Sequence, residues 1–164
     1  MTGVVSNTSP LTNLAAIGAM GLLERLFGRL HIAEAVRLEL EADGHDWPGR
    51  AEVAAAPWVE CHRIENRSLV LALSQDLDAG ESETIALGLE IGATLVLMDE
   101  RDGRHRAQRM GLRTMGVVGV LLRAKERGFL LAVRPSLDAL RSHAGFWLSD
   151  AVYRQALSVA NETG

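Results

Sequence analysis

A short apolar run that ends in acidic residues constrains the fold of this chain most strongly: residues 95–98 read L-V-L-M, and Asp99 follows directly. Four apolar residues are too few to span a membrane, but they suit a strand buried on both faces of a parallel sheet. In an open α/β sheet, ligands bind outside the carboxyl ends of the strands. Asp99 and Asp102 are therefore candidate ligands of a hard cation, and Arg101 and Arg104 are candidate phosphate contacts. The alternative interpretation is that Asp99 caps the helix that follows it.

Short apolar segments and amphipathic stretches alternate along the rest of the chain. At the first of them, Pro10 suits a first helical position and Ser9 is the expected N-cap. The alternation predicts an α/β sandwich with a mainly parallel sheet of five strands. The predicted strands are residues 4–6, 30–32, 58–64, 95–98 and 113–116, and the main predicted helices are residues 33–42, 78–91, 100–110, 117–127, 136–142 and 149–161.

Composition narrows the class of protein. A length of 164 residues with 48% hydrophobic content predicts a single domain over residues 1–164. No apolar run reaches about 18 residues, which argues against a transmembrane helix, and the first residues lack the pattern of a signal peptide. The lone Cys61 allows no internal disulfide, so we expect a cytoplasmic protein.

Charge is unevenly distributed. The net charge of −4 argues against a non-specific nucleic-acid binder. Between residues 101 and 125, however, seven Lys or Arg residues stand against the single acid Asp102. This basic segment is either a nucleic-acid contact or simply a solvated helix face.

Two glutamates fall on apolar sides of predicted helices. With residues placed 100° apart, Glu39 lies beside Leu40 on the apolar side of the helix over residues 33–42. Glu81 falls on the apolar side of the next acidic helix, whereas Glu83 lies on its polar side and is the reserve candidate. A carboxylate aimed at a core needs a partner, a metal or a raised pKa. The alternative for Glu39 is that it lies at the edge of the core and its carboxylate reaches water. The alternative for the acids near residue 81 is that they lie in the first turn of their helix, where the positive end of the helix dipole stabilises negative charge.

Several common sites are absent from the sequence. It has no dinucleotide-binding or P-loop glycine motif and no nucleophile elbow. Cys61 and His62 are adjacent, but no other Cys or His has a convincing ligand spacing, which argues against a zinc site. What remains is an acidic set, with Asn7 at the end of the first strand: Glu39, Glu81, Asp99 and Asp102.

Three short motifs resemble those of PIN domains, the fold of metal-dependent nucleases that includes the VapC-like toxins of toxin–antitoxin pairs. They read N-T-S-P-L at residues 7–11, G-E-S-E-T-I-A-L at residues 80–87 and M-D-E-R-D-G-R at residues 98–104. The chain is most similar to a prokaryotic PIN subfamily. The resemblance covers about residues 4–130, and C-terminal helices follow over residues 131–164.

The resemblance implies a three-layer α/β/α sandwich with strand order 3-2-1-4-5. That order would bring Asn7 beside Asp99, with Glu39 and Glu81 supplied by flanking helices, and Ser9 matches a hydroxyl that supports the metal site in relatives. The carboxylates of the acidic set would bind Mg²⁺ or Mn²⁺ and carry the catalysis, and Arg101 and Arg104 would contact phosphates of the substrate.

The activity implied by the resemblance is hydrolysis of phosphodiester bonds in RNA. Many PIN nucleases have aspartate where this chain has Asn7, and an amide brings no charge, so a non-catalytic module that binds RNA or a protein partner is the alternative. A small-molecule phosphohydrolase is a third possibility, disfavoured because no nucleophile motif accompanies the acids. We expect a homodimer, with Phe146 and Trp147 as a contact surface, and an antitoxin is a possible partner.

Overall fold

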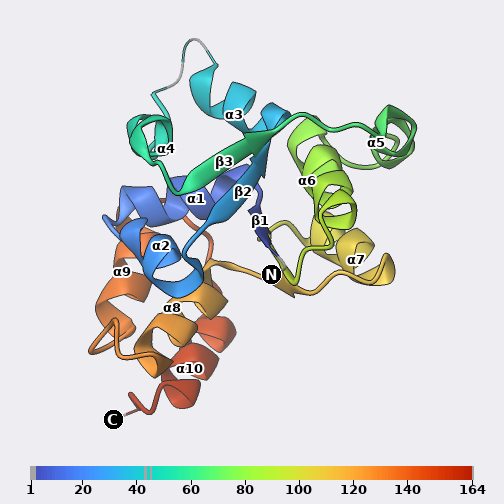
Figure 1. Cartoon of the computed structure of the whole chain (residues 1–164). Helices are drawn as coiled ribbons and strands as arrows, with labels where there is room; N and C mark the ends of the chain where they lie inside the picture. The colour runs from blue at the N-terminus through green and yellow to red at the C-terminus, as the bar shows by residue number, and fades with distance from the viewer. Residues whose placement is uncertain (1–2, 43, 45, 164) are drawn as a thin grey trace.

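The computed structural model describes residues 3–42, 44 and 46–163, and its centre is a five-stranded sheet (Figure 1). All strand pairs are parallel, and the strand order is β3-β2-β1-β4-β5. The predicted α/β class and the order 3-2-1-4-5 are thereby confirmed. The strands are β1 (Val4–Ser6), β2 (Leu30–Ala33), β3 (Val59–His62), β4 (Leu95–Leu97) and β5 (Thr114–Met115).

The two central strands position the acidic residues. Ser6 of β1 pairs with Leu97 of β4, and the backbone N–H of Asn7 donates to the carbonyl of Leu97 at 2.9 Å. Val5, Val96 and Leu97 are completely buried, as expected for strands covered on both faces. Strands β1 and β4 therefore end side by side, and the residues that follow them, Asn7 after β1 and Asp99 and Glu100 after β4, start from the same edge of the sheet.

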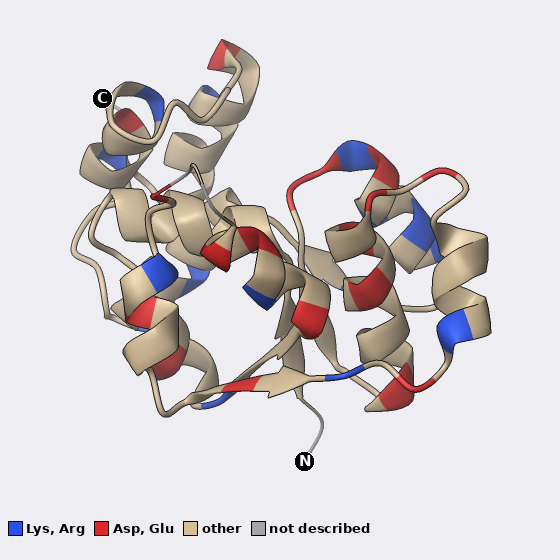
Figure 2. Ribbon diagram, turned by 90° about the horizontal axis from the view of Figure 1, so that it is seen from above, with Lys and Arg blue, Asp and Glu red and all other residues tan. Residues whose placement is uncertain are grey.

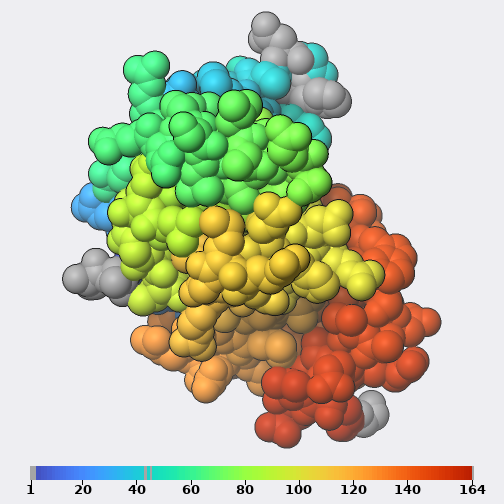
Figure 3. All heavy atoms as spheres, turned by 90° about the vertical axis from the view of Figure 1, so that its right-hand side faces the viewer, coloured from blue at the N-terminus to red at the C-terminus, as the bar shows by residue number. Residues whose placement is uncertain are grey.

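Helices cover both faces of the sheet, and the apolar side chains of the strands alternate between two cores. One face carries the larger core, formed with α1 (Thr8–Ala16), α2 (Gly21–Phe27), α8 (Val117–Glu126), α9 (Arg134–Ser142) and α10 (Asp150–Val159). The opposite face carries α5 (Arg67–Leu73), α6 (Ala79–Glu90) and α7 (Arg101–Arg109), which Figure 3 shows together on one side of the molecule. The short helices α3 (Glu34–Glu41) and α4 (Arg50–Ala55) follow β2 and precede β3.

Helix α6 is the most enclosed helix of the fold. Every residue from Gly80 to Gly88 is buried, because α6 packs against strands β1, β2 and β4 and against helices α3, α5 and α7. It therefore lacks the polar outer face that an amphipathic wheel assumes. Within the described part of the chain, no helix is long and apolar enough to cross a membrane.

The first helix begins two residues earlier than predicted. Asn7 is the N-cap of α1, so Pro10 is the third helical residue and Ser9 is not the cap. Pro is tolerated there because the first turn of a helix has no intrahelical partners for its N–H groups. The hydroxyl of Ser9 makes a different contact, described below.

The segment after α10 is attached to the start of α9. The carboxylate of Glu162 accepts hydrogen bonds from the backbone N–H groups of Val133 and Arg134, at 2.7 and 3.1 Å, and from Lys125 Nζ at 2.9 Å. These bonds lower the pKa of Glu162, with the Val133 N–H as the largest cause. The last three helices are thereby joined at one point.

Candidate functional site

Asn7 lies at the centre of the polar groups that end strands β1 and β4. Its side chain is only 3% exposed, and its amide Nδ2 donates to Glu100 Oε2 at 3.1 Å. Its Oδ1 lies 3.5 Å from the hydroxyl of Thr84, which donates to it from α6. A buried amide with partners on two other elements is well fixed in position.

Glu100 is the acid that reaches Asn7, and it was not among the site residues predicted from the sequence. Its second carboxylate oxygen, Oε1, accepts a hydrogen bond of 2.7 Å from the hydroxyl of Ser9. Glu100 is the N-cap residue of α7, yet its side chain makes no capping hydrogen bond and turns instead toward α1. The usable signal was its position within three residues of the end of β4, which it shares with Asp99.

Glycine at position 80 allows three elements to approach one another. A Cβ atom built there would lie 3.1 Å from Asn7 Oδ1, 3.1 Å from Glu39 Oε2 and 3.5 Å from Asp78 Oδ1. Glu39 comes from α3, where it is exposed, and its Oε2 accepts a 2.7 Å hydrogen bond from the hydroxyl of Thr8. We name Asn7, Glu39 and Glu100 the acidic site. Figure 2 shows acidic positions of α3 and α6 toward the middle of the molecule, where these helices face each other.

Glu81 borders the acidic site from the first turn of α6. It forms a capping box with Asp78: its Oε1 accepts from the Asp78 N–H at 3.0 Å, and its own N–H donates to Asp78 Oδ1 at 2.8 Å. Its Oε2 lies 3.3 Å from a Cβ built at Gly103 of α7. Burial raises the pKa of Glu81 above its ordinary value, and the nearby charges of Asp78 and Glu100 add to this effect.

Glu83, the reserve candidate, is buried but has structural partners. Its Oε1 accepts from the backbone N–H of Ala35 at 3.1 Å, and its Oε2 pairs with Arg67 Nη1 at 3.1 Å. It joins the first turn of α3 to α5. The helical wheel separated Glu81 from Glu83, but both are 8% exposed because α6 is enclosed around its circumference.

Asp99 contacts the start of helix α8. Its Oδ1 accepts a 2.9 Å hydrogen bond from the N–H of Val117, the first residue of α8, whose own N-cap is Gly116 and has no side chain. The capping interpretation of Asp99 named the wrong helix, since α7 is preceded by Glu100. Asp99 Oδ2 is buried without a hydrogen-bond partner. Burial raises the pKa of Asp99 to about 6; Glu100 also raises it, whereas the Val117 N–H and Arg104 oppose the change.

The remaining sequence-selected residues lie on helix α7. Arg101 and Asp102 are exposed in its first turn, and Arg104 is half-buried. Arg104 Nη1 and Asp99 Oδ1 both lie against Gly116, 3.0 and 2.6 Å from a Cβ built there. Asp102 is therefore exposed to solvent, as is Glu39 among the predicted acids.

The oxygens that converge on the acidic site have the chemistry of a hard-cation site. Asn7 Oδ1 and Glu39 Oε2 approach the same glycine, Glu100 accepts a hydrogen bond from the amide nitrogen of Asn7, and Glu81 and Asp99 carry raised pKa values. Hard divalent cations prefer such oxygen ligands, and closely placed carboxylates need a compensating positive charge. The residues present therefore fit a divalent metal.

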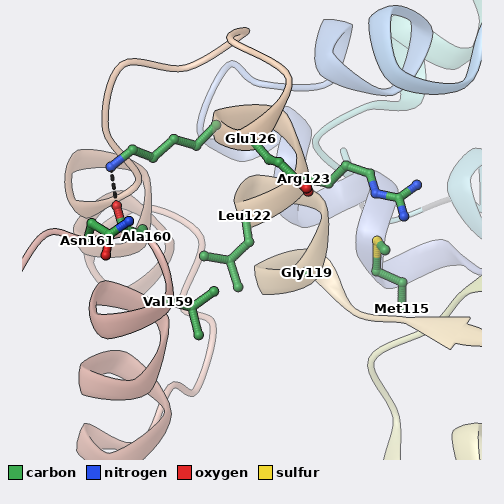
Figure 4. A pocket seen from close by; sticks show the side chains of 9 residues that line it. Met115, Gly119, Leu122, Arg123, Glu126, Val159, Ala160 and Asn161 are labelled. Atoms are coloured by element: carbon green, nitrogen blue, oxygen red, sulfur yellow. Dashed lines mark hydrogen bonds between the residues drawn. The ribbon is translucent and has the colours of Figure 1, made fainter.

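Two surface cavities border helix α8, outside the acidic site. One, of about 540 Å³, separates α8 from the end of α10, where Lys125 donates to the carbonyl of Ala160 (Figure 4). The other, of about 450 Å³, runs from Asp99 and Arg104 to Trp147. The second cavity thus connects the end of β4 with the segment before α10.

A parallel sheet in this order, with carboxylate and amide groups gathered where β1 and β4 end, defines an α/β fold whose ligand site lies at that edge of the sheet and whose oxygen atoms suit a divalent metal. Comparison with protein families agrees with this class. A family model described as a PIN domain matches residues 3–162, and the chain belongs to the PIN-domain family. PIN domains generally use divalent metals. No curated protein matches the sequence.

Proposed function

We propose that this protein is a ribonuclease that hydrolyses phosphodiester bonds with the help of Mg²⁺ or Mn²⁺. The observation that supports this most directly is the approach of Asn7 Oδ1 and Glu39 Oε2 to Gly80, with Glu100 hydrogen-bonded to Asn7. The PIN-domain family, whose fold is of nuclease type, supports the same conclusion.

We assign the inner metal ligands to the acidic site, Asn7, Glu39 and Glu100. Glu81 and Asp99 border this site, and Asp102 is exposed in the first turn of α7. A bound Mg²⁺ or Mn²⁺ would orient a water molecule for in-line attack and stabilise charge on the scissile phosphate. Hydroxyl groups position the ligands: Ser9 holds Glu100 and Thr8 holds Glu39.

Positive charge for the substrate comes from helix α7. Arg101 is exposed there, and Arg104 lies beside Asp99 at the cavity that leads to Trp147. We propose that both guanidinium groups contact phosphates of RNA, because such contacts fix the register of a nucleic acid without selecting its sequence. The other arginines of the basic segment extend the same attraction along the molecule.

Cleavage of a single-stranded RNA with a fluorophore and quencher tests the proposal. Glu100→Gln and Glu39→Gln should each reduce Mn²⁺-dependent cleavage at least tenfold, and Asp102→Asn should have the smallest effect among the acids. Glu41→Gln is the matched control, since Glu41 lies on the same helix as Glu39 and pairs with Arg37 in an exposed i,i+4 contact. Circular dichroism at each step shows whether a variant is folded. Cleavage by Glu100→Gln equal to that of the unmodified protein would contradict the assignment.

A second candidate function is a non-catalytic module that binds RNA or a protein. The observation that favours it is the amide of Asn7, which donates a hydrogen bond to Glu100 and brings no negative charge of its own, whereas an aspartate at this position would add one. Under this proposal, fluorescence anisotropy detects RNA binding that depends on Arg101 and Arg104, with no cleavage at any Mn²⁺ concentration. Metal-dependent cleavage abolished by Glu100→Gln would exclude it.

We further propose that the protein is a homodimer and the toxin of a toxin–antitoxin pair. Trp147 is 83% exposed at the rim of the cavity that includes Asp99, whereas its neighbour Leu148 is buried. A large exposed aromatic side chain is typical of a contact surface. Light scattering at micromolar concentration should give the mass of a dimer, and Trp147→Ser should shift it toward the monomer. A monomer mass for the unmodified protein would contradict the homodimer.

A further inference from the structure

Three potential metal ligands meet on the outer strands of the sheet, apart from the acidic site. They are His31 of β2 and Glu60 and His62 of β3. His31 Nδ1 lies 2.8 Å from His62 Nε2, and the two rings are tilted by 46°. Glu60 Oε2 is 3.9 Å from His31 Nδ1, and Glu60 Oε1 is 3.8 Å from His62 Nε2.

Strand register explains why the sequence did not reveal this cluster. His31 pairs with Glu60, and His62 lies two residues further along β3, so all three side chains project from the same face of the sheet. Sequence motifs for zinc sites rely on ligands that are close together in the sequence, and His62 has no histidine partner nearby in the sequence. The second histidine is 31 residues away and becomes a neighbour only through the pairing of β2 with β3.

A glycine makes room for the first imidazole. A Cβ built at Gly3 would lie 2.7 Å from Cδ2 and 2.9 Å from Nε2 of His31, closer than such atoms approach. The ring thus packs against the backbone that enters β1, and Nδ1 is the nitrogen left to face His62. The His31 side chain is 16% exposed, the His62 side chain 25% and the Glu60 side chain 46%, so the cluster is open to water on the Glu60 side.

We propose that His31, Glu60 and His62 form a second metal site, selective for Zn²⁺ and related late first-row cations. In tetrahedral zinc sites with metal–ligand bonds of 2.0–2.1 Å, neighbouring ligand atoms are about 3.3 Å apart. The two imidazole nitrogens are 2.8 Å apart, and one ligand atom from each of the three residues lies within 4.8 Å of the other two, so a rotation of the Glu60 side chain toward the imidazoles brings the set close to that value. Two histidines and a carboxylate supply three ligands, and water completes the shell.

Ligand type separates this site from the acidic one. Imidazole nitrogen favours Zn²⁺, Co²⁺, Ni²⁺ and Cu²⁺, whereas an oxygen-only site favours Mg²⁺ and Mn²⁺. Arg29 holds Glu60 Oε2 at 3.1 Å and leaves Oε1 to face His62. A metal bound here would fasten the edge strand β3 to β2.

Co²⁺ is the probe for this site, because its visible absorption reports the ligand set directly. The full chain, free of any histidine tag, is titrated with Co²⁺ in the presence of excess Mg²⁺ and then with Zn²⁺ as competitor. We expect visible bands from one Co²⁺ per chain, displaced by Zn²⁺, and a higher melting temperature with Zn²⁺. His62→Gln and His31→Gln should each weaken Co²⁺ binding at least tenfold, and Glu60→Gln should weaken it less.

Two further variants separate the possible outcomes. His143→Gln removes an exposed histidine outside the cluster and should leave Co²⁺ binding unchanged, as should Glu100→Gln in the acidic site. If His31→Gln proves unstable, the more exposed His62 and Glu60 still test the site. Co²⁺ binding that is absent, or unchanged in His62→Gln and Glu60→Gln, would overturn the proposal. Loss of Co²⁺ binding in Glu100→Gln alone would assign the ion to the acidic site instead.

Discussion

Replacement of Asn7 by aspartate tests the acidic site most sharply, because it changes one amide group into a carboxylate. The substitution removes the 3.1 Å hydrogen bond from Asn7 Nδ2 to Glu100 Oε2. A hydrogen bond to a charged group contributes about 1.5–3 kcal/mol to stability. Two like charges 4 Å apart add a repulsion of about 4 kcal/mol at an effective dielectric constant of 20, and uptake of a proton limits that cost.

Without metal, we therefore expect Asn7→Asp to lower the free energy of unfolding by about 3 kcal/mol at pH 8. The folded state of this variant binds a proton more tightly than the unfolded state, so the loss should shrink as the pH falls through the range of carboxylate titration. Divalent metal should reverse the loss as well, since a ligand at 100 times its Kd stabilises the folded state by about 2.7 kcal/mol. The affinity for Mg²⁺ and Mn²⁺ should rise because the new ligand is charged.

Urea unfolding with EDTA and with Mg²⁺, together with calorimetric titration of Mn²⁺, measures both effects. Asn13→Asp adds the same charge to the same helix, α1, and is the matched control. Cleavage of single-stranded RNA at limiting Mn²⁺ should increase in Asn7→Asp. Equal stability of Asn7→Asp and the unmodified protein in EDTA would refute the contact between Asn7 and Glu100. An unchanged Mn²⁺ affinity would show that Asn7 is not a ligand.

Three other substitutions test separate parts of the structure. In EDTA, Asp99→Asn should be more stable than the unmodified protein by about 2–3 kcal/mol at pH 8 and equal to it near pH 4. The reason is that Asp99 has a pKa of about 6 in the folded protein against an ordinary value of 3.8, so its ionisation destabilises the fold as the pH rises. Equal melting curves of Asp99→Asn and the unmodified protein at pH 8 would contradict this. Gly80→Ala should weaken Mn²⁺ binding without unfolding α6, because its methyl group would lie 3.1 Å from Glu39 Oε2; unchanged affinity in calorimetry would place the metal elsewhere. Gly3→Ala should displace the ring of His31 and abolish Co²⁺ binding in the absorption assay, and full retention would contradict the packing described.

Sequence periodicity predicted the fold well because each strand is short and bounded by clear signals. Apolar runs at residues 4–6 and 95–98 match β1 (Val4–Ser6) and β4 (Leu95–Leu97) almost residue for residue. The strand predicted over residues 58–64 was longer than β3 (Val59–His62), although the carbonyl of Trp58 still accepts a hydrogen bond from Leu30 of β2. Local patterns thus located the elements, while their ends depend on neighbours that sequence alone does not show.

The site was harder to predict because membership of the site depends on where each side chain points, which the spacing of residues in the sequence does not show. Asp99 and Glu100 are adjacent, and only the structure shows that Glu100 turns toward Asn7 while Asp99 turns toward Val117. A helical wheel cannot rank Glu81 above a neighbour on a helix with no outer face. Contacts between strands, such as the one that joins two histidines of β2 and β3, depend on register, which has no local signature.

The attachment of Glu162 to the start of α9 has a consequence for how the molecule opens. The N–H groups of Val133 and Arg134 precede or begin their helix, so they have no intrahelical acceptor and bond to a carboxylate that follows α10. Their hydrogen exchange must therefore wait for the release of the C-terminal segment, whatever the local stability of α9. We therefore expect α9 and α10 to open as one cooperative unit, with the release of the segment around Glu162 as the first step.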